Sequence, residues 1–315
     1  MNGISSANFA QPLFSFGIIS DVQYADIPDG CSFLGVPRFY RTSFDVLRRG
    51  RNYWNDEGVK FVVNLGDIVD GFCPRVESRS AVEKVVNEFA AFNGSVHHLI
   101  GNHCLYNLPR EELLPLLNIH DRCGRAYYDF SLSGFRFVFL DGYDVSAIGW
   151  PEDHPNAAEA VELLRLRNPN PNKNSPDGLA GVDRRFVMFN GGVGAEQMAW
   201  LDAVLSEAEG RGEKAVVSCH LPLEPTSSSP EALLWNYGEV MDVIHRYRCV
   251  KACLSGHDHR GGYATDSRGI CHRVFEAALE CPPGSDAYGR IDVFDDRLSV
   301  IGVGRMKSQE MVFST

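Results

Sequence analysis

Five short apolar runs of this chain each end in residue types that bind metal ions, and this repeated pattern constrains the fold more than any other feature. The runs are FSFGIIS, KFVVNLG, VHHLIG, AVVSC and VKACLSG. Each has the length and the β-branched or apolar content of a buried strand. The polar residues that end the runs are, in chain order, Asp21 and Gln23, Asp67 and Asp70, Asn102 and His103, His220, and His257 and His259.

Strands that all carry oxygen and nitrogen ligands at their C-terminal ends predict a single site. Open α/β sheets bind ligands in the crevice outside the carboxyl ends of their strands. Between the runs, residues 82, 85, 86 and 89 form the apolar stripe of an amphipathic helix over 78–92. Further helices are predicted at 41–57, 195–209 and 237–247. Alternating strands and helices indicate a parallel α/β core.

Other segments suggest additional strands and one insertion. Residues 126–141 read as a hairpin, and β-rich stretches follow at 272–278, 289–294 and 297–303. Two sheets flanked by helices are the natural packing for this many strands. The Pro- and Asn-rich stretch at about 149–185 is predicted to be a lid-like insertion. We expect a single domain over residues 1–315.

The composition limits the classes of partner. A formal net charge of −11 disfavours nucleic acid, but a small anionic substrate is compatible with local cations. Nine cysteines without a C-x-x-C pair favour a reducing compartment, so we expect a cytoplasmic protein. The N-terminal residues show no signal peptide, and the chain has no apolar run long enough for a membrane span. We expect a monomer.

The polar residues suit a pair of divalent metal ions. Two-metal hydrolysis needs a carboxylate that bridges the ions, separate ligands for each, and an open position for hydroxide. Asp67 is the natural bridge, because Gly66 before it lets the backbone turn close to the ions. The remaining ligands are predicted to divide into two groups, Asp21, Gln23 and His259 for one ion, and Asn102, His220 and His257 for the other.

The spacing of these residues supports this division. Alternate residues of an extended segment point the same way, so Asp21 with Gln23, and His257 with His259, reach the site together. Since adjacent side chains diverge, His103 is not expected to bind the ion that Asn102 holds. We predict that His103 is the general acid that protonates the leaving oxygen. Asp70 is predicted to orient its imidazole, although capping of a turn explains Asp70 as well.

With these five blocks in order, the chain resembles the calcineurin-like metallophosphoesterases. Their pattern is D-x-H, G-D-x-x-D, G-N-H, a lone His and G-H-x-H, and the resemblance spans roughly residues 14–260. It implies a four-layer α/β/β/α sandwich with mixed sheets, and the same ligand roles. A phosphoprotein phosphatase fits less well, because Gly71 and Cys104 stand where those enzymes have Arg and Glu.

One departure from the family pattern narrows the resemblance. Gln23 stands where the family has His, and the motif D-x-Q-Y-A-D at 21–26 is similar to the manganese-dependent ADP-ribose/CDP-alcohol diphosphatases. The FNGG turn at 189–192 and GHDHRGGY at 256–263 resemble the same subgroup. An amide oxygen in place of an imidazole makes the site harder, which favours Mn²⁺ or Mg²⁺ over Zn²⁺.

Residues that contact the substrate are harder to predict. Phe33, Tyr40 and Tyr263 are candidates to stack on a nucleobase, but packing beneath a loop explains them equally well. The arginines of 38–51 suit a diphosphate or a solvated helix face. Asp141 and Asp144 follow a further predicted strand, but their spacing does not predict that they lie at the site.

Three functions are consistent with these features. The resemblance implies a Mn²⁺-dependent hydrolase of the phosphoanhydride in ADP-ribose, CDP-choline and related nucleoside diphosphate-alcohols or sugars, releasing a nucleoside monophosphate. The alternative is a hydrolase of cyclic nucleotides or other phosphodiesters with the same fold. A non-catalytic scaffold is the third, and the intact set of ligands argues against it.

Overall fold

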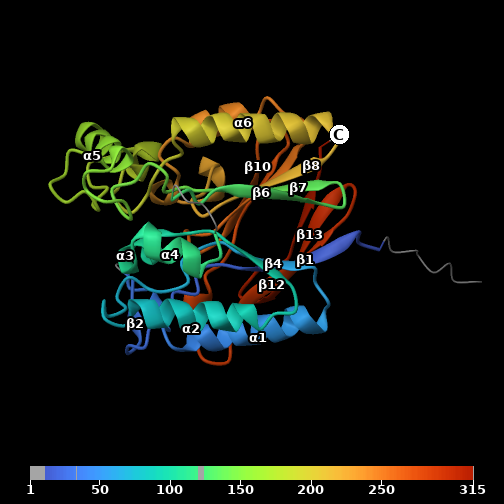
Figure 1. Cartoon of the computed structure of the whole chain (residues 1–315), viewed down its shortest axis with the longest axis horizontal. Coiled ribbons are helices and arrows are strands. Elements are labelled where there is room, and N and C mark those ends of the chain that lie inside the picture. The colour runs from blue at the N-terminus through green and yellow to red at the C-terminus, as the bar shows by residue number, and fades with distance from the viewer. Residues whose placement is uncertain (1–10, 33, 120–123, 315) are drawn as a thin grey trace, which may run out of the picture.

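Two six-stranded sheets lie face to face, and helices cover their outer faces (Figure 1). The computed structural model describes residues 11–32, 34–119 and 124–314. In Figure 1, α1 and α2 lie along one side of the sandwich and α6 along the other. The four-layer α/β/β/α sandwich expected from the sequence is therefore confirmed.

The first sheet contains the strands of the first three apolar runs. Its order is β14-β13-β12-β1-β4-β5, with β1, β4 and β5 parallel and the others antiparallel. The strands are β1 (Phe14–Ile19), β4 (Phe61–Asn64), β5 (Ser95–His98), β12 (Ala287–Val293), β13 (Arg297–Gly304) and β14 (Gln309–Val312).

The second sheet contains the last two runs and has the order β10-β11-β9-β8-β7-β6. Its four central strands are parallel, and the edge strands β10 and β6 are antiparallel to their neighbours. The strands are β6 (Tyr128–Leu132), β7 (Phe135–Leu140), β8 (Lys214–Cys219), β9 (Val250–Ser255), β10 (Gly262–Thr265) and β11 (Cys271–Val274). A small ribbon pairs β2 (Gly30–Cys31) with β3 (Pro37–Arg38).

The four predicted helices are present, together with α5 inside the insertion and two short helices that were not predicted. The helices are α1 (Thr42–Asp56), α2 (Ser78–Ala90), α3 (Asn102–Asn107), α4 (Arg110–Leu116), α5 (Pro155–Arg167), α6 (Ala195–Gly210) and α7 (Tyr237–Ile244). Short 3₁₀ turns cover Gly181–Arg185, Pro225–Ser227, Pro230–Ala232 and Ala278–Glu280. The unpredicted helices α3 and α4 are too short to show helical periodicity.

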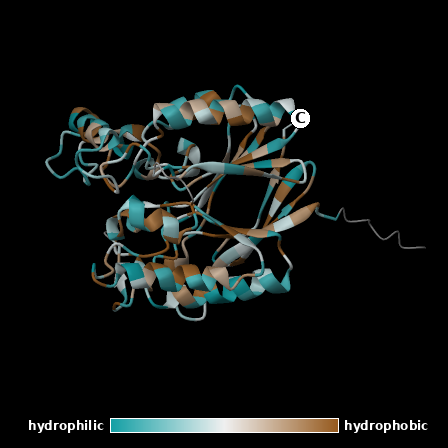
Figure 2. Cartoon of the chain, viewed as in Figure 1, coloured by the Kyte–Doolittle hydropathy of each residue, from teal (hydrophilic) through white to brown (hydrophobic). Residues whose placement is uncertain are grey.

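The strands bury both faces, which explains why they read as continuous apolar runs. In β7, Phe135, Phe137 and Phe139 face the first sheet, while Val138 and Leu140 pack on the helix side. Brown, apolar stretches appear along the strands between the layers, and brown and teal bands alternate on the helices (Figure 2). Because Phe137 is fully buried, its replacement by alanine would cost about 3–5 kcal/mol.

The stretch between β7 and α6 has a small apolar cluster of its own. Val145, Ala160, Leu164, Phe186 and Trp235 pack together there, and α5 projects at the end of the sandwich where α3 and α4 also lie (Figure 1). None of the helices in the described ranges combines the length and apolar character that crossing a membrane requires.

Candidate metal centre

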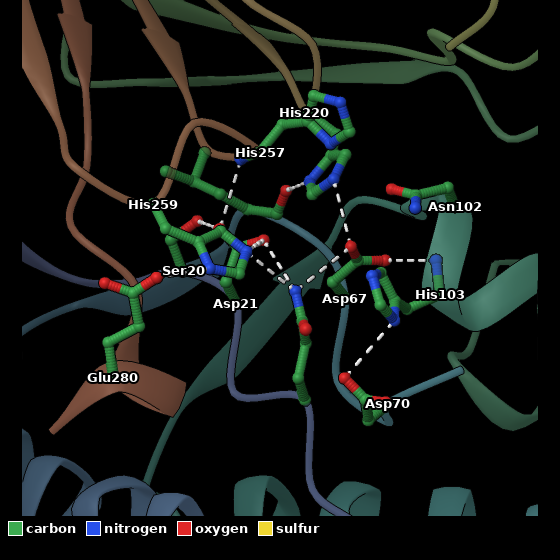
Figure 3. Close-up of polar contacts among 12 residues, drawn as sticks. Ser20, Asp21, Asp67, Asp70, Asn102, His103, His220, His257, His259 and Glu280 are labelled. Carbon is green, nitrogen blue, oxygen red and sulfur yellow. Dashed lines mark hydrogen bonds and ion pairs between the residues drawn. The ribbon is translucent and has the colours of Figure 1, made fainter. Parts of the chain in front are cut away.

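The predicted ligands converge from both sheets at the C-terminal ends of their strands (Figure 3). The first sheet contributes the residues after β1, β4 and β5, and the second sheet those after β8 and β9. All of these side chains except His257 and His259 are buried, and those two are mostly buried. Parallel strands of both sheets thus end at one site, as the sequence predicted.

The backbone at the site is unusual. Within the described ranges, six residues other than glycine have a positive φ, and four of them are predicted ligands. They are Asp21 at 50°, Gln23 at 42°, Asp67 at 52° and His257 at 67°. This left-handed conformation costs roughly 1–3 kcal/mol for a side-chain-bearing residue, and such residues cluster at functional sites. The strand ends therefore turn sharply to aim their side chains at one another.

Glycines next to these turns make room for the ligands. A Cβ atom on Gly66 would lie 2.5 Å from Nδ1 of His220, and one on Gly101 would overlap the carboxylate of Asp67. A Cβ atom on Gly256 would lie 2.8 Å from Oδ2 of Asp21. The glycine in each of the G-D, G-N and G-H blocks is thus required by close packing under the site.

Asp21, Gln23 and His259 form the first ligand group. Nε2 of Gln23 lies 3.3 Å from Oδ1 of Asp21 and 2.9 Å from Nε2 of His259. It also lies 3.5 Å from Oδ2 of Asp67. The amide oxygen of Gln23 is buried without a hydrogen-bond partner. Rotation of the amide by 180° would turn this oxygen toward the same groups, where a cation would satisfy it.

His220 and His257 of the second group lie close to Asp67, with one ligand atom of each of the three residues within 4.8 Å of the others. Nδ1 of His220 lies 2.7 Å from the carbonyl oxygen of Leu65, so Nδ1 carries the hydrogen. Nε2 therefore keeps its lone pair. It lies 3.4 Å from Oδ2 of Asp67 and has no hydrogen-bond partner. An unpaired buried nitrogen beside a carboxylate fits a divalent cation.

In the first group, Asp21 and His259 stabilise each other in their charged forms. Burial tends to raise the pKa of Asp21, but the hydrogen bond and charge of His259, together with the charge of His220 and the hydrogen bond from Ser20, lower it overall. Burial tends to lower the pKa of His259, while Asp21 and Glu280 raise it to about 10. Without metal, a proton on His259 thus neutralises the carboxylate of Asp21. A metal ion that binds His259 must displace this proton.

Asn102 is the first residue of α3, and the backbone amide of His103 donates to Oδ1 of Asp67 at 2.8 Å. Oδ1 of Asn102 accepts a hydrogen bond from the hydroxyl of Tyr143 at 3.3 Å. An amide oxygen has two lone pairs, so this contact leaves one for a cation. Tyr143 follows β7, and sequence reasoning missed it.

His103 lies beside both Asp70 and Gly71. The backbone N–H of Gly71 donates to Nδ1 of His103 at 2.8 Å, and Oδ2 of Asp70 lies 3.3 Å from the same nitrogen. Because the amide of Gly71 donates to Nδ1, the neutral ring carries its hydrogen on Nε2, and a ring with hydrogen on both nitrogens carries one there as well. The imidazole is therefore held by two groups at Nδ1, and Nε2 carries a hydrogen in either form.

The candidates for substrate contact are scattered. Phe33 lies outside the described residues. Tyr40 is buried, and burial together with the charge of Asp70 raises its pKa. Tyr263 is 37% exposed on the edge strand β10, with its hydroxyl 3.2 Å from Oγ1 of Thr265.

The remaining charged residues from the sequence pair elsewhere in the structure. Four arginines form ion pairs with carboxylates away from the site, namely Arg41, Arg48, Arg49 and Arg51. Arg38 differs, because its guanidinium lies 3.7 Å from Asp70, beside His103. Asp141 binds the buried guanidinium of Arg110 at 2.7 Å. Asp144 accepts a hydrogen bond from the backbone of Gly194 at 3.0 Å, at the start of α6.

Glu280 is a further residue of the site that the sequence did not predict. Its Oε1 lies 3.1 Å from Nδ1 of His259, so it fixes the ring with Nε2 toward Asp21 (Figure 3). Glu280 lies in the 3₁₀ turn Ala278–Glu280, outside every predicted strand end. No spacing in the sequence relates it to the site. Histidines that bind metal usually have such a partner on their second nitrogen, which is the one signal that could have prompted a search.

Comparisons with known proteins agree with this geometry. Residues 14–261 match the family model described as calcineurin-like phosphoesterase. A protein of Arabidopsis thaliana named manganese-dependent ADP-ribose/CDP-alcohol diphosphatase is 60% identical over 95% of this chain and 97% of its own length. A human protein of the same name is 37% identical, over 96% of this chain and 93% of its own.

A crystal structure of a dimetal phosphatase from Danio rerio is also similar. It superposes with a TM-score of 0.92 at 39% identity, covering 96% of this chain and 100% of that structure. The family match, the relatives and the arrangement of strand-end ligands lead to the same assignment. The chain belongs to the calcineurin-like phosphoesterase family.

Proposed function

We propose that this protein is a manganese-dependent hydrolase of the phosphoanhydride in ADP-ribose, CDP-choline and related nucleoside diphosphate-alcohols or sugars. Water and ADP-ribose would give AMP and ribose 5-phosphate, and water and CDP-choline would give CMP and phosphocholine. The observation that carries this proposal is Gln23 in the first ligand group, in a chain 60% identical to a relative with that name.

We propose that Asp21, Gln23 and His259 hold one ion, that Asn102, His220 and His257 hold the other, and that Asp67 bridges them. These residues suit Mn²⁺ or Mg²⁺, because carboxylate and amide oxygens supplement the imidazoles. Bound divalent ions would activate a water at neutral pH and neutralise charge on the phosphate oxygens. The tautomers set by Leu65 and Glu280 keep a lone pair of His220 and of His259 directed into the site.

His103 is proposed to donate the proton to the departing phosphate oxygen from Nε2, while Asp70 and the amide of Gly71 hold Nδ1. Replacement of His103 by glutamine should slow ADP-ribose hydrolysis by about 10²–10⁴-fold. The rate of hydrolysis of an aryl phosphodiester, whose phenolate leaves without needing a proton, should fall far less in the same variant. Equal losses for both substrates would contradict the acid role.

A substrate panel tests the proposed reaction. The metal-stripped protein is assayed with ADP-ribose, CDP-choline and cyclic AMP at equal concentration, with Mn²⁺, Mg²⁺ or Zn²⁺ added singly. We expect fast release of AMP and CMP with Mn²⁺, slower release with Mg²⁺, and little with EDTA. Preference for cyclic AMP would instead support the phosphodiester alternative, and equal turnover with Zn²⁺ would contradict manganese dependence.

Two properties of the whole chain are also proposals. We propose a monomer in the reducing cytoplasm, where the eight described cysteines stay as the free thiols that the structure shows. We further propose that residues 149–185 belong to the same single domain and act as a lid. Light scattering measures the mass, and cell fractionation the compartment. One thermal transition should unfold the insertion together with the sheets.

A further inference from the structure

The loop between the insertion and α6 reaches the second ligand group through one fully buried side chain, Asn190. Oδ1 of Asn190 lies 2.9 Å from Nε2 of His257. Nδ2 donates to two carbonyl oxygens, that of Arg185 at 2.9 Å and that of Glu231 at 2.6 Å. The carboxamide therefore connects a proposed ligand to two separate loops.

These contacts determine which way round the amide of Asn190 lies. The carbonyl oxygens of Arg185 and Glu231 only accept hydrogen bonds, so the NH₂ group must face them. The amide oxygen then faces His257, and it accepts only if Nε2 of the ring carries the hydrogen. Nδ1 of His257 consequently keeps its lone pair. The ligand atom of His257 is thus determined by carbonyls that lie outside the site.

We propose that Asn190 is a positioning residue for the second metal ion, because it holds His257 in the tautomer and orientation that present Nδ1 to the cation. This inference rests on the proposed function and adds a residue to it. His220 and His259 are held in the same way, by the carbonyl of Leu65 and the carboxylate of Glu280. Of the three groups that hold these imidazoles, Asn190 is the one that lies in the loop directly after the insertion.

The neighbouring residue supports the same ligand group. The carbonyl oxygen of Phe189 lies 3.4 Å from the hydroxyl of Tyr143, which also contacts Asn102. The ring of Phe189 lies 5.9 Å from that of His257, measured between centroids. Residues 189–190 thus contact His257 and the partner of Asn102. Since His257 has a left-handed backbone, at φ 67°, its ring depends on such contacts for its placement.

Two variants separate the hold on His257 from general packing. Asn190→Leu removes the acceptor and both donors, whereas Asn190→Asp removes the donors but keeps an acceptor for Nε2–H. Calorimetric titration of the metal-stripped protein with Mn²⁺ is the readout. We expect Asn190→Leu to bind one of the two ions about 10–100-fold more weakly. Asn190→Asp should bind both with affinities close to wild type, although both variants melt at lower temperature.

Asn168 offers a matched control within the insertion. It is also fully buried, and its Nδ2 donates to three carbonyl oxygens, those of Lys173, Ser175 and Phe186. None of these contacts reaches a proposed ligand. Asn168→Leu should therefore lower the melting temperature while leaving both Mn²⁺ affinities unchanged. Loss of one ion in Asn168→Leu, to the extent seen in Asn190→Leu, would show that loosening of the insertion explains the effect.

A measurement on the wild-type protein reports the tautomer of His257 directly. In histidine labelled with ¹⁵N, long-range correlation spectra distinguish the two neutral tautomers. The metal-free protein should show His257 with hydrogen on Nε2, its signals being identified by their loss in His257→Gln. The opposite tautomer, wild-type affinities in Asn190→Leu, or equal losses in Asn190→Asp and Asn190→Leu would overturn the inference. A wild type that binds fewer than two ions would instead contradict the proposed function.

Discussion

The molecule contains two clusters in which aspartate meets histidine at about 3 Å, and they differ in nearly every other respect. In the strand-end cluster, Asp67 lies 3.4 Å from His220. In the second cluster, Asp266 lies 2.9 Å from His245 and 3.1 Å from His272. The distances between aspartate and histidine are thus shorter in the second cluster, whereas the strand-end cluster is the one in which three ligand atoms, those of Asp67, His220 and His257, lie within 4.8 Å of one another.

Hydrogen bonding separates the two clusters. Oδ2 of Asp266 contacts both imidazoles, and its Oδ1 accepts from the backbone of Arg268 and of Ile270, each at 2.9 Å. That carboxylate has its partners within the protein. In the strand-end cluster, Nε2 of His220 and Oε1 of Gln23 have none. Unmet bonding capacity in buried polar atoms marks a site that awaits a ligand.

The two clusters also differ in backbone conformation. The strand-end cluster has four left-handed ligands and three glycines whose Cβ positions the ligands occupy. The residues of the second cluster have ordinary backbone, and Asp266 simply closes the turn between β10 and β11. Strain that is retained only at the first cluster indicates function there, whereas the second indicates stability.

The largest expected effect comes from the bridging carboxylate. Asp67→Asn should lower kcat/KM for ADP-ribose with Mn²⁺ by about a thousandfold or more, because a neutral amide cannot offset the charge of two cations. Asparagine keeps an oxygen that can accept the hydrogen bond from the backbone amide of His103, so the variant should still fold. Circular dichroism checks the fold. If the activity of Asp67→Asn stayed within tenfold of wild type, the assignment of the strand-end cluster as the functional one would be contradicted.

The same change in the second cluster should do the reverse. Asp266→Asn removes a carboxylate that accepts from two histidines, so the free energy of unfolding should fall by about 2 kcal/mol. Activity per folded molecule and affinity for Mn²⁺ should stay within about twofold of wild type. Urea denaturation measures the first quantity and calorimetry the second. If Asp266→Asn lost metal, the second cluster would not be merely structural.

A smaller effect is expected from Gln23→His. An imidazole in the first group makes that site softer, so the preference for Mn²⁺ over Zn²⁺ should shift toward Zn²⁺ by about tenfold, or about 1.4 kcal/mol. Rates with each metal, measured on ADP-ribose and cyclic AMP, report the shift. Gln23→Glu serves as the control that keeps an oxygen ligand. Unchanged rates and unchanged metal preference in Gln23→His would mean that Gln23 is not a ligand.

The smallest effect is a pH dependence of the second cluster. Burial tends to raise the pKa of Asp266, but hydrogen bonds from His272 and His245 lower it below its ordinary value of 3.8. A depressed pKa stabilises the fold above about pH 4, and this contribution is lost as the pH falls further. The stability difference between wild type and Asp266→Asn should therefore shrink below about pH 4. A constant difference in urea denaturation down to about pH 2.5 would contradict this.

Much of the architecture followed from local patterns. The five strands, the hairpin at 126–141 and the helices α1, α2, α6 and α7 were predicted, because their periodicity and turn residues lie within short windows. Strands β10 and β14 and helices α3 and α4 have only four to seven residues and were not predicted. Helix α3 still matters, because its first turn carries Asn102 and His103.

The partners of the site residues could not be predicted in this way. Glu280 is 21 positions from His259, and Asn190 is 67 positions from His257. Tyr143 is 41 positions from Asn102. No periodicity relates such pairs, since their contact depends on how two sheets and an insertion pack together. The basic run at 38–51 shows the same limit, because only the fold reveals which carboxylates its arginines meet.

The sequence by itself determined which residues lie together at the strand ends, because parallel strands place their carboxyl ends at one edge whatever the details of packing. It also determined that an amide stands at position 23 in place of an imidazole, which is a matter of residue type. Only the tertiary structure decided which nitrogen of each histidine faces the site and which aspartate cluster lacks partners. A tautomer depends on the hydrogen bond at the other nitrogen, and distant segments supply that bond only once the chain has folded.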